Sequence, residues 1–185
     1  MATATERTRN VEGPDGTPHR FTFDDFVRLG EIGLLPTRSE LVDGEVFDLR
    51  PKGEPHYFAA FALQRQLIHA DRGRYVAGPG PTLQLDDANA PMPDILVTPR
   101  GKRVSSAAAE LVVEVADSSL NYDRGEKRRR YAKAKIREYW VLDVNGEMLE
   151  RYLPAGAPKP TISSGRRRTG AVGVPRRRNR SRRHL

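Results

Sequence analysis

The sequence predicts an α/β domain in which helices flank a central β-sheet of mixed direction. Three observations lead to this fold class. The run Leu111–Ala116 is apolar and rich in β-branched residues, as expected for a strand covered on both faces. Segments with helical spacing of apolar residues lie before and after it. An Asp43-Gly44 pair between two β-prone runs indicates a hairpin, because both residues tolerate a positive φ.

The expected elements follow one another with turn residues between them. Thr22 and Asp25 have capping-box spacing and predict a first helix, whose apolar face includes Phe26. Further expected elements are a hairpin over 40–49, a helix over 56–70, strands over 74–77, 82–85, 95–98 and 111–116, a helix over 123–135, and strands over 139–143 and 148–153 around a turn at 145–146. Tyr131 and Trp140 are expected to pack inside the domain rather than to stack on bases.

The chain of 185 residues suits one domain with tails. We expect a flexible N-terminal arm over 1–20, the domain over 21–154 and a basic disordered tail over 155–185. The net charge of +8 comes from this tail, which holds 10 of the 32 Lys and Arg and no acid; the remaining 22 basic and 24 acidic residues give −2. We hypothesise that the tail is either the product of a shifted reading frame or a nucleic-acid-binding arm.

The chain contains no cysteine, which excludes disulfides and thiolate metal sites. Oxygen and histidine ligands would therefore have to hold any bound metal, which favours Mg²⁺ or Mn²⁺. No apolar run resembles a signal peptide or reaches the length of a membrane span. We therefore expect a cytoplasmic protein without a membrane partner.

Two acids stand at positions that suit metal-dependent phosphodiester chemistry. Asp94 follows Pro93 where a strand opens, and Glu114 lies in the middle of the most apolar strand, where an ionised carboxylate is costly. A divalent cation shared by the two acids would remove that cost and would activate water against a phosphate. The alternatives are a surface-facing or Arg-paired Glu114 and an Asp94 that serves only the turn.

The run VVEVADSSLNYDRGEKRRRYAKAKIREYWVLD, with PMPDILV and ELVDGEV before it, resembles the Uma-two family of restriction-endonuclease-like nucleases in the PD-(D/E)XK superfamily. The resemblance covers residues 21–153. It implies a restriction-endonuclease-like fold and a magnesium site formed by Asp94 and Glu114, which Glu40 supports directly or through water. The superfamily's usual lysine, two residues after the second acid, is replaced here by Ala116. The resemblance assigns the lysine role to Lys127 in the next helix.

Four further residues are candidates for contact with the substrate. Lys127 would orient the attacking water or stabilise charge on the phosphate; the alternative is a solvated lysine on a helix face. The resemblance also favours a histidine at His56, which could contact a phosphate or have only a local role at its helix start. Arg124 and Arg128 are candidate nucleic-acid contacts, although charged helix faces are usually solvated.

The sequence thus predicts a metal-dependent endonuclease with Asp94, Glu114 and Lys127 as catalytic residues and DNA as the expected substrate. The alternative is a catalytically inactive module of the same fold that binds nucleic acid or protein, which the alanine at position 116 would suit. A toxin-like nuclease is a third interpretation that the sequence does not decide. A homodimer is compatible with nuclease activity, because a double-strand cut needs two sites.

Overall fold

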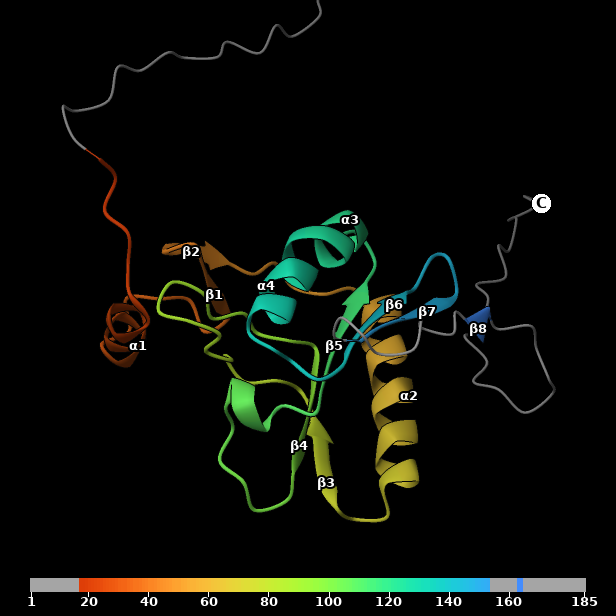
Figure 1. The fold of residues 1–185 in the computed structure, drawn as a ribbon. Helices are drawn as coiled ribbons and strands as arrows, with labels where there is room; N and C mark the ends of the chain where they lie inside the picture. Colours follow the sequence, from red (N-terminus) through yellow and green to blue (C-terminus); the bar gives the residue numbers. More distant parts are fainter. Residues whose placement is uncertain (1–16, 154–162, 165–185) are drawn as a thin grey trace, which may run out of the picture.

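The computed structural model describes residues 17–153 and 163–164. Its main sheet has six strands in the order β3-β4-β5-β6-β7-β8, and all neighbours are antiparallel except the parallel pair β5 and β6. Figure 1 shows α2 along one side of this sheet and the segment from α3 to α4 on another side. A second, two-stranded sheet consists of β1 and β2. The predicted α/β fold with a mixed central sheet is therefore confirmed.

The elements lie close to their expected positions. The strands of the described residues are β1 (Ser39–Val42), β2 (Glu45–Asp48), β3 (Tyr75–Gly78), β4 (Ile95–Pro99), β5 (Leu111–Ala116), β6 (Tyr139–Asp143), β7 (Met148–Tyr152) and β8 (Ser163–Ser164). The helices are α1 (Phe23–Glu31), α2 (Glu54–Asp71), α3 (Leu120–Tyr122) and α4 (Arg128–Lys133), with a 3₁₀ turn η1 (Ser106–Ala108) and a π turn η2 (Asp123–Lys127).

Strand β5 forms the centre of the core, and all six of its residues are buried. Val112 and Ala116 pack in one cluster with Tyr131, which lies on α4. Val113 points to the opposite face, where it packs with Leu63 of α2 and with other apolar side chains. As predicted, β5 is covered on both faces, by α4 on one face and by α2 on the other. Side chains alternate between the two faces of a strand, so Glu114 lies on the same face as Val112 and Ala116, which is the face covered by α4.

The N-terminal elements form a separate small cluster beside the main sheet. The capping box predicted at Thr22 and Asp25 is present at the start of α1. Phe26 of α1 packs against Leu41 of β1, and Leu41 also pairs with Ala90 through an isolated bridge. The predicted hairpin turn is present too, since Asp43 has a φ of 49° and Gly44 a φ of 77°. This cluster fixes β1, and with it Glu40, against the loop that leads into β4.

The predicted strand over 82–85 is wrong. Leu83 N donates to Pro91 O and Leu85 N donates to Asn89 O, so this segment does run alongside 89–93. The partner segment contains Pro91 and Pro93, which have no N–H and cannot return the hydrogen bonds of a β-ladder. The result is an irregular pair of extended segments that ends directly before Asp94.

The predicted helix over 123–135 is present only in part. Helical structure begins at Leu120 and ends at Lys133, and the π turn η2 interrupts it over Asp123–Lys127. Short π segments of this kind are frequent at functional sites because they alter the direction of the side chains that they carry. Here the interrupted turn carries Lys127.

The predicted N-terminal arm and C-terminal tail lie largely outside the described residues. Within the tail, Ser163 and Ser164 form β8 and pair with Leu149 and Met148 of β7. The expectation of a disordered tail otherwise falls on residues outside those described and stays a prediction. Of the helices that the structure describes, none has the length and apolar character needed to span a membrane.

Candidate active site

Asp94 and Glu114 lie on the same face of two neighbouring strands. Asp94 directly precedes β4, and the register of β4 with β5 pairs Ile95 with Val113. One step further along this register places Asp94 opposite Glu114, and directly opposed residues of an antiparallel pair project to the same face. Asp94 is fixed in this position because its Oδ2 accepts a hydrogen bond of 2.8 Å from Val115 N.

The backbone before Asp94 packs closely against the backbone at Gly80. Gly80 N donates to Pro93 O at 3.0 Å, so the residue before Asp94 is bonded to the 80–85 segment. A Cβ at position 80 would lie 2.6 Å from Pro93 O, which leaves no room for a side chain. The glycine is needed here for close approach and not for a positive φ.

Glu114 is almost fully buried, with 2% of its surface exposed. Its Oε1 accepts a hydrogen bond of 2.8 Å from Tyr131 Oη and one of 3.2 Å from Lys127 Nζ. Tyr131 is itself buried in the core cluster on this face. Its ring packs as predicted, and its hydroxyl, whose contact the sequence did not predict, orients the Glu114 carboxylate.

Lys127 lies between two buried carboxylates. Its Nζ is 2.9 Å from Glu40 Oε1 and 3.2 Å from Glu114 Oε1, and only 9% of the residue is exposed. Glu40 Oε1 also accepts a hydrogen bond of 2.9 Å from Met92 N, which anchors it to the segment before β4. The solvated helix-face interpretation of Lys127 is therefore wrong, and the lysine ammonium belongs to the same cluster as Glu114.

Two basic side chains lie on the other side of Asp94. His56, at the start of α2, is buried, and its Nε2 lies 2.9 Å from Asp94 Oδ2 without the orientation of a hydrogen bond. Lys52, in the loop before α2, reaches within 4.0 Å of the same oxygen. His56 thus faces the carboxylate and is not exposed to solvent at its helix start.

Glu114, Lys127 and Asp94 have shifted pKa values. Burial raises the pKa of Glu114 to about 8, although the nearby Lys127 charge opposes this. Burial also acts to lower the pKa of Lys127, but its attraction to Glu114 and Glu40 outweighs that effect and the net shift is upward. For Asp94 burial acts to raise the pKa, and the contacts with His56 and Lys52 outweigh it, so the pKa lies below its ordinary value. Asp94 and Lys127 therefore carry charge at neutral pH.

Asp94, Glu114 and Glu40 each use only one carboxylate oxygen in their contacts with residues 17–153. The bonds and ion pairs described above reach Asp94 Oδ2, Glu114 Oε1 and Glu40 Oε1. Within residues 17–153, no hydrogen bond or ion pair reaches the second oxygen of any of them. Oxygen donors of this kind fit a hard divalent cation. Within the same residues, no three His, Asp or Glu side chains form a preformed metal cluster. The Lys127 ammonium lies between Glu40 and Glu114 and occupies the place where such a cluster would form.

The comparisons with known proteins agree with this geometry. A family model named Uma2, with the description "Putative restriction endonuclease", matches residues 23–172. The chain belongs to the Uma2 family. The family resemblance of the sequence is thereby confirmed, and the match includes residues beyond the domain boundary that was predicted at position 154.

A crystal structure shares the fold of this Uma2 chain. It is described as a "putative nuclease belonging to DUF820 from Anabaena variabilis", and it aligns with a TM-score of 0.59 at 15% identity over 77% of this chain and 83% of that one. At this identity the likeness shows a common restriction-endonuclease-like fold. A search of curated proteins finds no match. The description of the family as putative restriction endonucleases indicates a nuclease.

The two arginines proposed as nucleic-acid contacts are engaged inside this Uma2 domain. The Arg124 guanidinium binds Glu150 through two of its nitrogens and lies 3.4 Å from Asp143 Oδ2. The Arg128 guanidinium lies 4.3 Å from the centre of the Tyr152 ring. Arg124 and Arg128 thus link η2 and α4 to the strands β6 and β7, and their part in binding nucleic acid stays a prediction.

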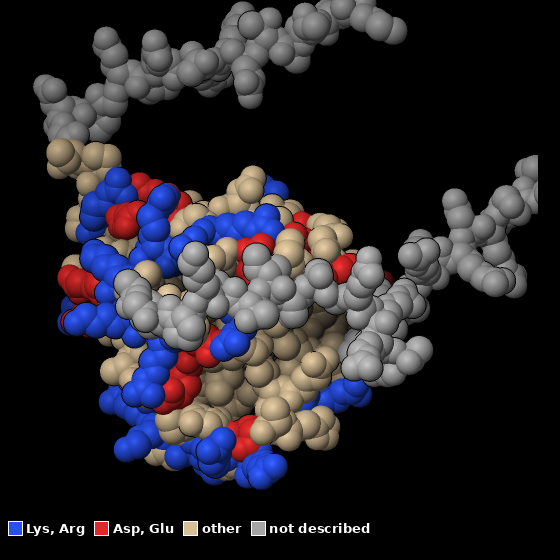
Figure 2. Space-filling model, turned by 45° about the vertical axis from the view of Figure 1, so that its right-hand side comes forward, with Lys and Arg blue, Asp and Glu red and all other residues tan. Residues whose placement is uncertain are grey.

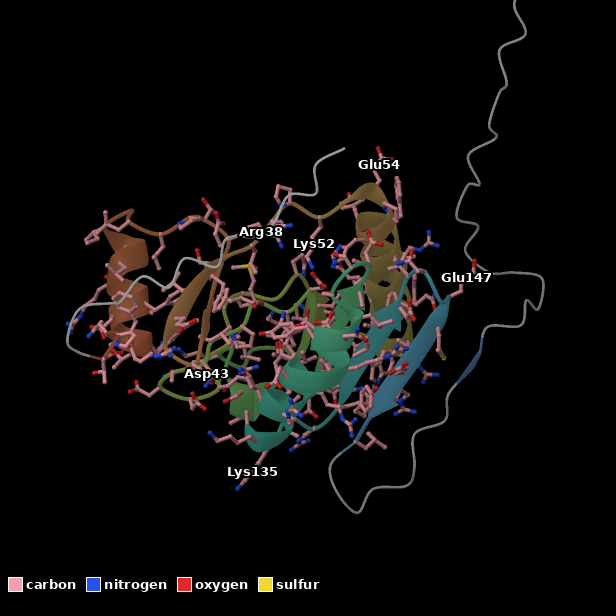
Figure 3. The ribbon with its side chains drawn as sticks, turned by 90° about the horizontal axis from the view of Figure 1, so that it is seen from above. Arg38, Asp43, Lys52, Glu54, Lys135 and Glu147 are labelled. Carbon is pink, nitrogen blue, oxygen red and sulfur yellow. The ribbon has the colours of Figure 1, made fainter. Side chains whose placement is uncertain are left out.

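Sequence reasoning missed two residues of the site. Asp123 is buried, and burial raises its pKa despite a hydrogen bond from Ser119 Oγ. Lys52 faces Asp94 and, with Arg38, lines a pocket next to it; Figure 3 shows both basic residues on the same side of the molecule. Asp123 could have been found from its place in the DRGEK run, four residues before Lys127. No pattern of spacing pointed to Lys52, because its loop position is set by the tertiary fold.

Proposed function

We propose that this chain is a metal-dependent endonuclease that hydrolyses phosphodiester bonds in nucleic acid, with DNA as the expected substrate. The observation that supports this most strongly is the pairing of Asp94 and Glu114 on one face of two adjacent strands, each with one carboxylate oxygen unused by the described residues. A buried and charged lysine lies beside them. The family description as a restriction endonuclease supports the same chemistry.

Asp94 and Glu114 are the residues that would hold Mg²⁺ or Mn²⁺. Such an ion, when bound, offsets negative charge on the phosphate and lowers the pKa of a water molecule enough to form hydroxide near neutral pH. Burial disfavours the ionised form of Glu114, and the charge of Lys127 is shared with Glu40. A bound cation would supply the further positive charge that stabilises the ionised Glu114 carboxylate. The donor set therefore fits a hard cation.

The remaining residues of the site position these groups and supply charge. Glu40 holds the Lys127 ammonium on the Glu114 side, so that the ammonium can stabilise negative charge that develops on the phosphate. This assigns Glu40 an anchoring role in place of direct metal binding. Tyr131 donates to Glu114 and fixes its orientation, while His56 and Lys52 hold Asp94 in its ionised form. Rigid placement of this kind is what catalysis by orientation requires.

A cleavage assay tests the proposal. Purified full chain is incubated with supercoiled plasmid and with single-stranded DNA and RNA, in Mg²⁺, in Mn²⁺ and in EDTA. We expect cleavage only with a divalent ion, and loss of cleavage in Asp94→Asn and Glu114→Gln. Glu31→Gln, which changes an exposed acid at the end of α1, serves as the matched control and should cleave normally. Metal-independent cleavage, or full activity of Glu114→Gln, would overturn the proposed mechanism.

One observation favours an inactive module that keeps the fold. Lys127 lies where a third ligand would complete a cluster with Glu40 and Glu114, and no three-ligand group converges among the described residues. Calorimetry with Mn²⁺ separates the two functions. An active site should bind the ion in a manner that depends on both Asp94 and Glu114, whereas an inactive module should show no such binding.

A further inference from the structure

The first half of α2 carries an exposed aromatic strip formed by Tyr57, Phe58 and Phe61. Their exposed fractions are 63%, 50% and 55%. The Tyr57 and Phe61 rings lie one helical turn apart, with centroids separated by 6.5 Å and planes only 11° from parallel. Phe58 meets the Tyr57 ring edge to face at 5.6 Å. Large aromatic rings that are gathered on a surface mark a binding site more often than isolated apolar residues do.

The aromatic strip begins at the candidate active site. Tyr57 lines a pocket of about 390 Å³ together with Asp94 and His56, so one end of the strip shares a cavity with the proposed catalytic acid. Lys52 and Arg38 line the same pocket. Figure 3 shows these two basic side chains close to the end of α2 that carries Glu54. A strand bound along α2 would therefore pass two cations where it enters the site.

The charge along α2 suits an anionic partner. Between Pro55 and Ala70 the helix contains no Asp or Glu, and it carries an exposed Arg65. Figure 2, which brings the α2 side of the molecule forward, shows an area without charged side chains whose border carries Lys and Arg together with some Asp and Glu. Exposed rings next to basic side chains are the combination by which proteins bind unpaired bases together with their phosphates.

We propose that the aromatic strip stacks on unpaired bases, so that the nucleic acid bound at this site is single-stranded or locally unpaired. The flat faces of bases in a duplex are covered by their neighbours, and only an unpaired base can offer its face to Tyr57 or Phe61. The bases would lie along α2 while the backbone passes Lys52 towards Asp94. This inference rests on the proposed function for the position of the scissile phosphate.

Binding without cleavage tests the inference separately from activity. Fluorescence anisotropy is measured in EDTA with a labelled single-stranded oligonucleotide and with the duplex of the same sequence, using the full chain. We expect tighter binding of the single strand, and about a tenfold loss of single-strand affinity in each of Tyr57→Ala and Phe61→Ala. Duplex affinity should change by less than about twofold, because both variants leave the basic side chains of the chain unchanged.

Two further variants act as controls. Tyr57→Trp keeps a stacking ring and should bind the single strand within about twofold of the parent chain. Leu34→Ala removes an equally exposed apolar side chain, 67% exposed, from the region after α1 and should have no effect. Circular dichroism checks that each variant is folded.

The outcomes that would overturn this inference differ from those that would overturn the proposed nuclease activity. Equal affinity for single strand and duplex, or unchanged affinity in Tyr57→Ala and Phe61→Ala, would show that the strip does not stack on bases. If the two alanine variants instead convert a dimer to a monomer in sedimentation and bind single strands normally, the strip is an interface between copies. A chain that binds single strands through the strip but cleaves nothing would keep this inference and remove the proposed function.

Discussion

Replacement of Lys127 by methionine should destabilise the fold strongly and in a pH-dependent way. Lys127→Met keeps the volume of the side chain but removes the cation that Glu40 and Glu114 share at 2.9 and 3.2 Å. Both acids are buried, with 3% and 2% exposure, so water cannot replace the lost partner. Removal of one partner of a buried ion pair costs about 3–5 kcal/mol. For a chain of this size that corresponds to a fall in Tm of roughly 6–20 °C.

The pH dependence of the Lys127→Met deficit follows from Glu114. Burial already raises the pKa of Glu114 to about 8, from the value of 4.5 for an ordinary glutamate, and loss of the lysine charge removes the opposing effect. A carboxyl whose folded pKa is raised stays protonated in the fold while the unfolded chain loses its proton. Folding stability therefore falls as pH rises above the unfolded pKa. In the parent chain this loss of stability ends near pH 8, where Glu114 ionises beside Lys127, whereas in Lys127→Met it continues to higher pH. The deficit should therefore be larger at about pH 9.5 than at about pH 7.

Urea denaturation followed by circular dichroism, at pH 7 and pH 9.5, measures this effect. Lys133→Met is the matched control, because Lys133 lies on α4 as well but its side chain is 80% exposed and 3.6 Å from Asp86. A solvent-exposed pair of this kind contributes at most about 1 kcal/mol, so the control should be close to the parent chain at both pH values. A Lys127→Met deficit below about 1 kcal/mol at pH 9.5, or one that is equal at both pH values, would refute the reasoning.

Three further predictions concern the site and its support. Asp94→Asn and Glu114→Gln should each lower kcat/KM for DNA cleavage at least roughly a hundredfold without loss of fold, as measured by plasmid cleavage and circular dichroism. Tyr131→Phe removes a hydrogen bond that favours ionised Glu114, so the rise of activity with pH should move to higher pH; an unchanged pH profile would contradict this. Gly80→Ala should lower the free energy of unfolding by about 1–3 kcal/mol, because a Cβ there meets backbone. Gly30→Ala, with open space around its Cβ, should be neutral or stabilise by up to about 1 kcal/mol in the same thermal melts.

The sequence was sufficient for the fold class and for the positions of the proposed catalytic acids. The apolar, β-branched run around Glu114 predicts a strand covered on both faces, which the structure confirms. The capping box at Thr22 and the turn at Asp43-Gly44 are local signals that are also present in the structure. Local signals of this kind depend on neighbouring residues alone, and for that reason they can be identified without a tertiary model.

The remaining features depend on contacts between distant parts of the chain. The segment 82–85 looks like a strand until its partner is known to contain Pro91 and Pro93. The π turn that carries Lys127 could not be identified from helical periodicity, because residues 123–130 contain no large apolar side chain whose spacing would reveal one inserted residue. The burial of Lys127 could not be predicted either, because the residue lies in a charged stretch of sequence. Its buried position depends on an ion pair with Glu40, which is 87 positions away in the chain.

A crystal structure of the full chain soaked in Mn²⁺, with anomalous diffraction data, tests the central claim most directly. The proposed function predicts an anomalous peak within bonding distance, about 2.0–2.2 Å, of one carboxylate oxygen of Asp94 and one of Glu114. Absence of a peak at saturating Mn²⁺, or a peak bound only by other residues, would contradict it.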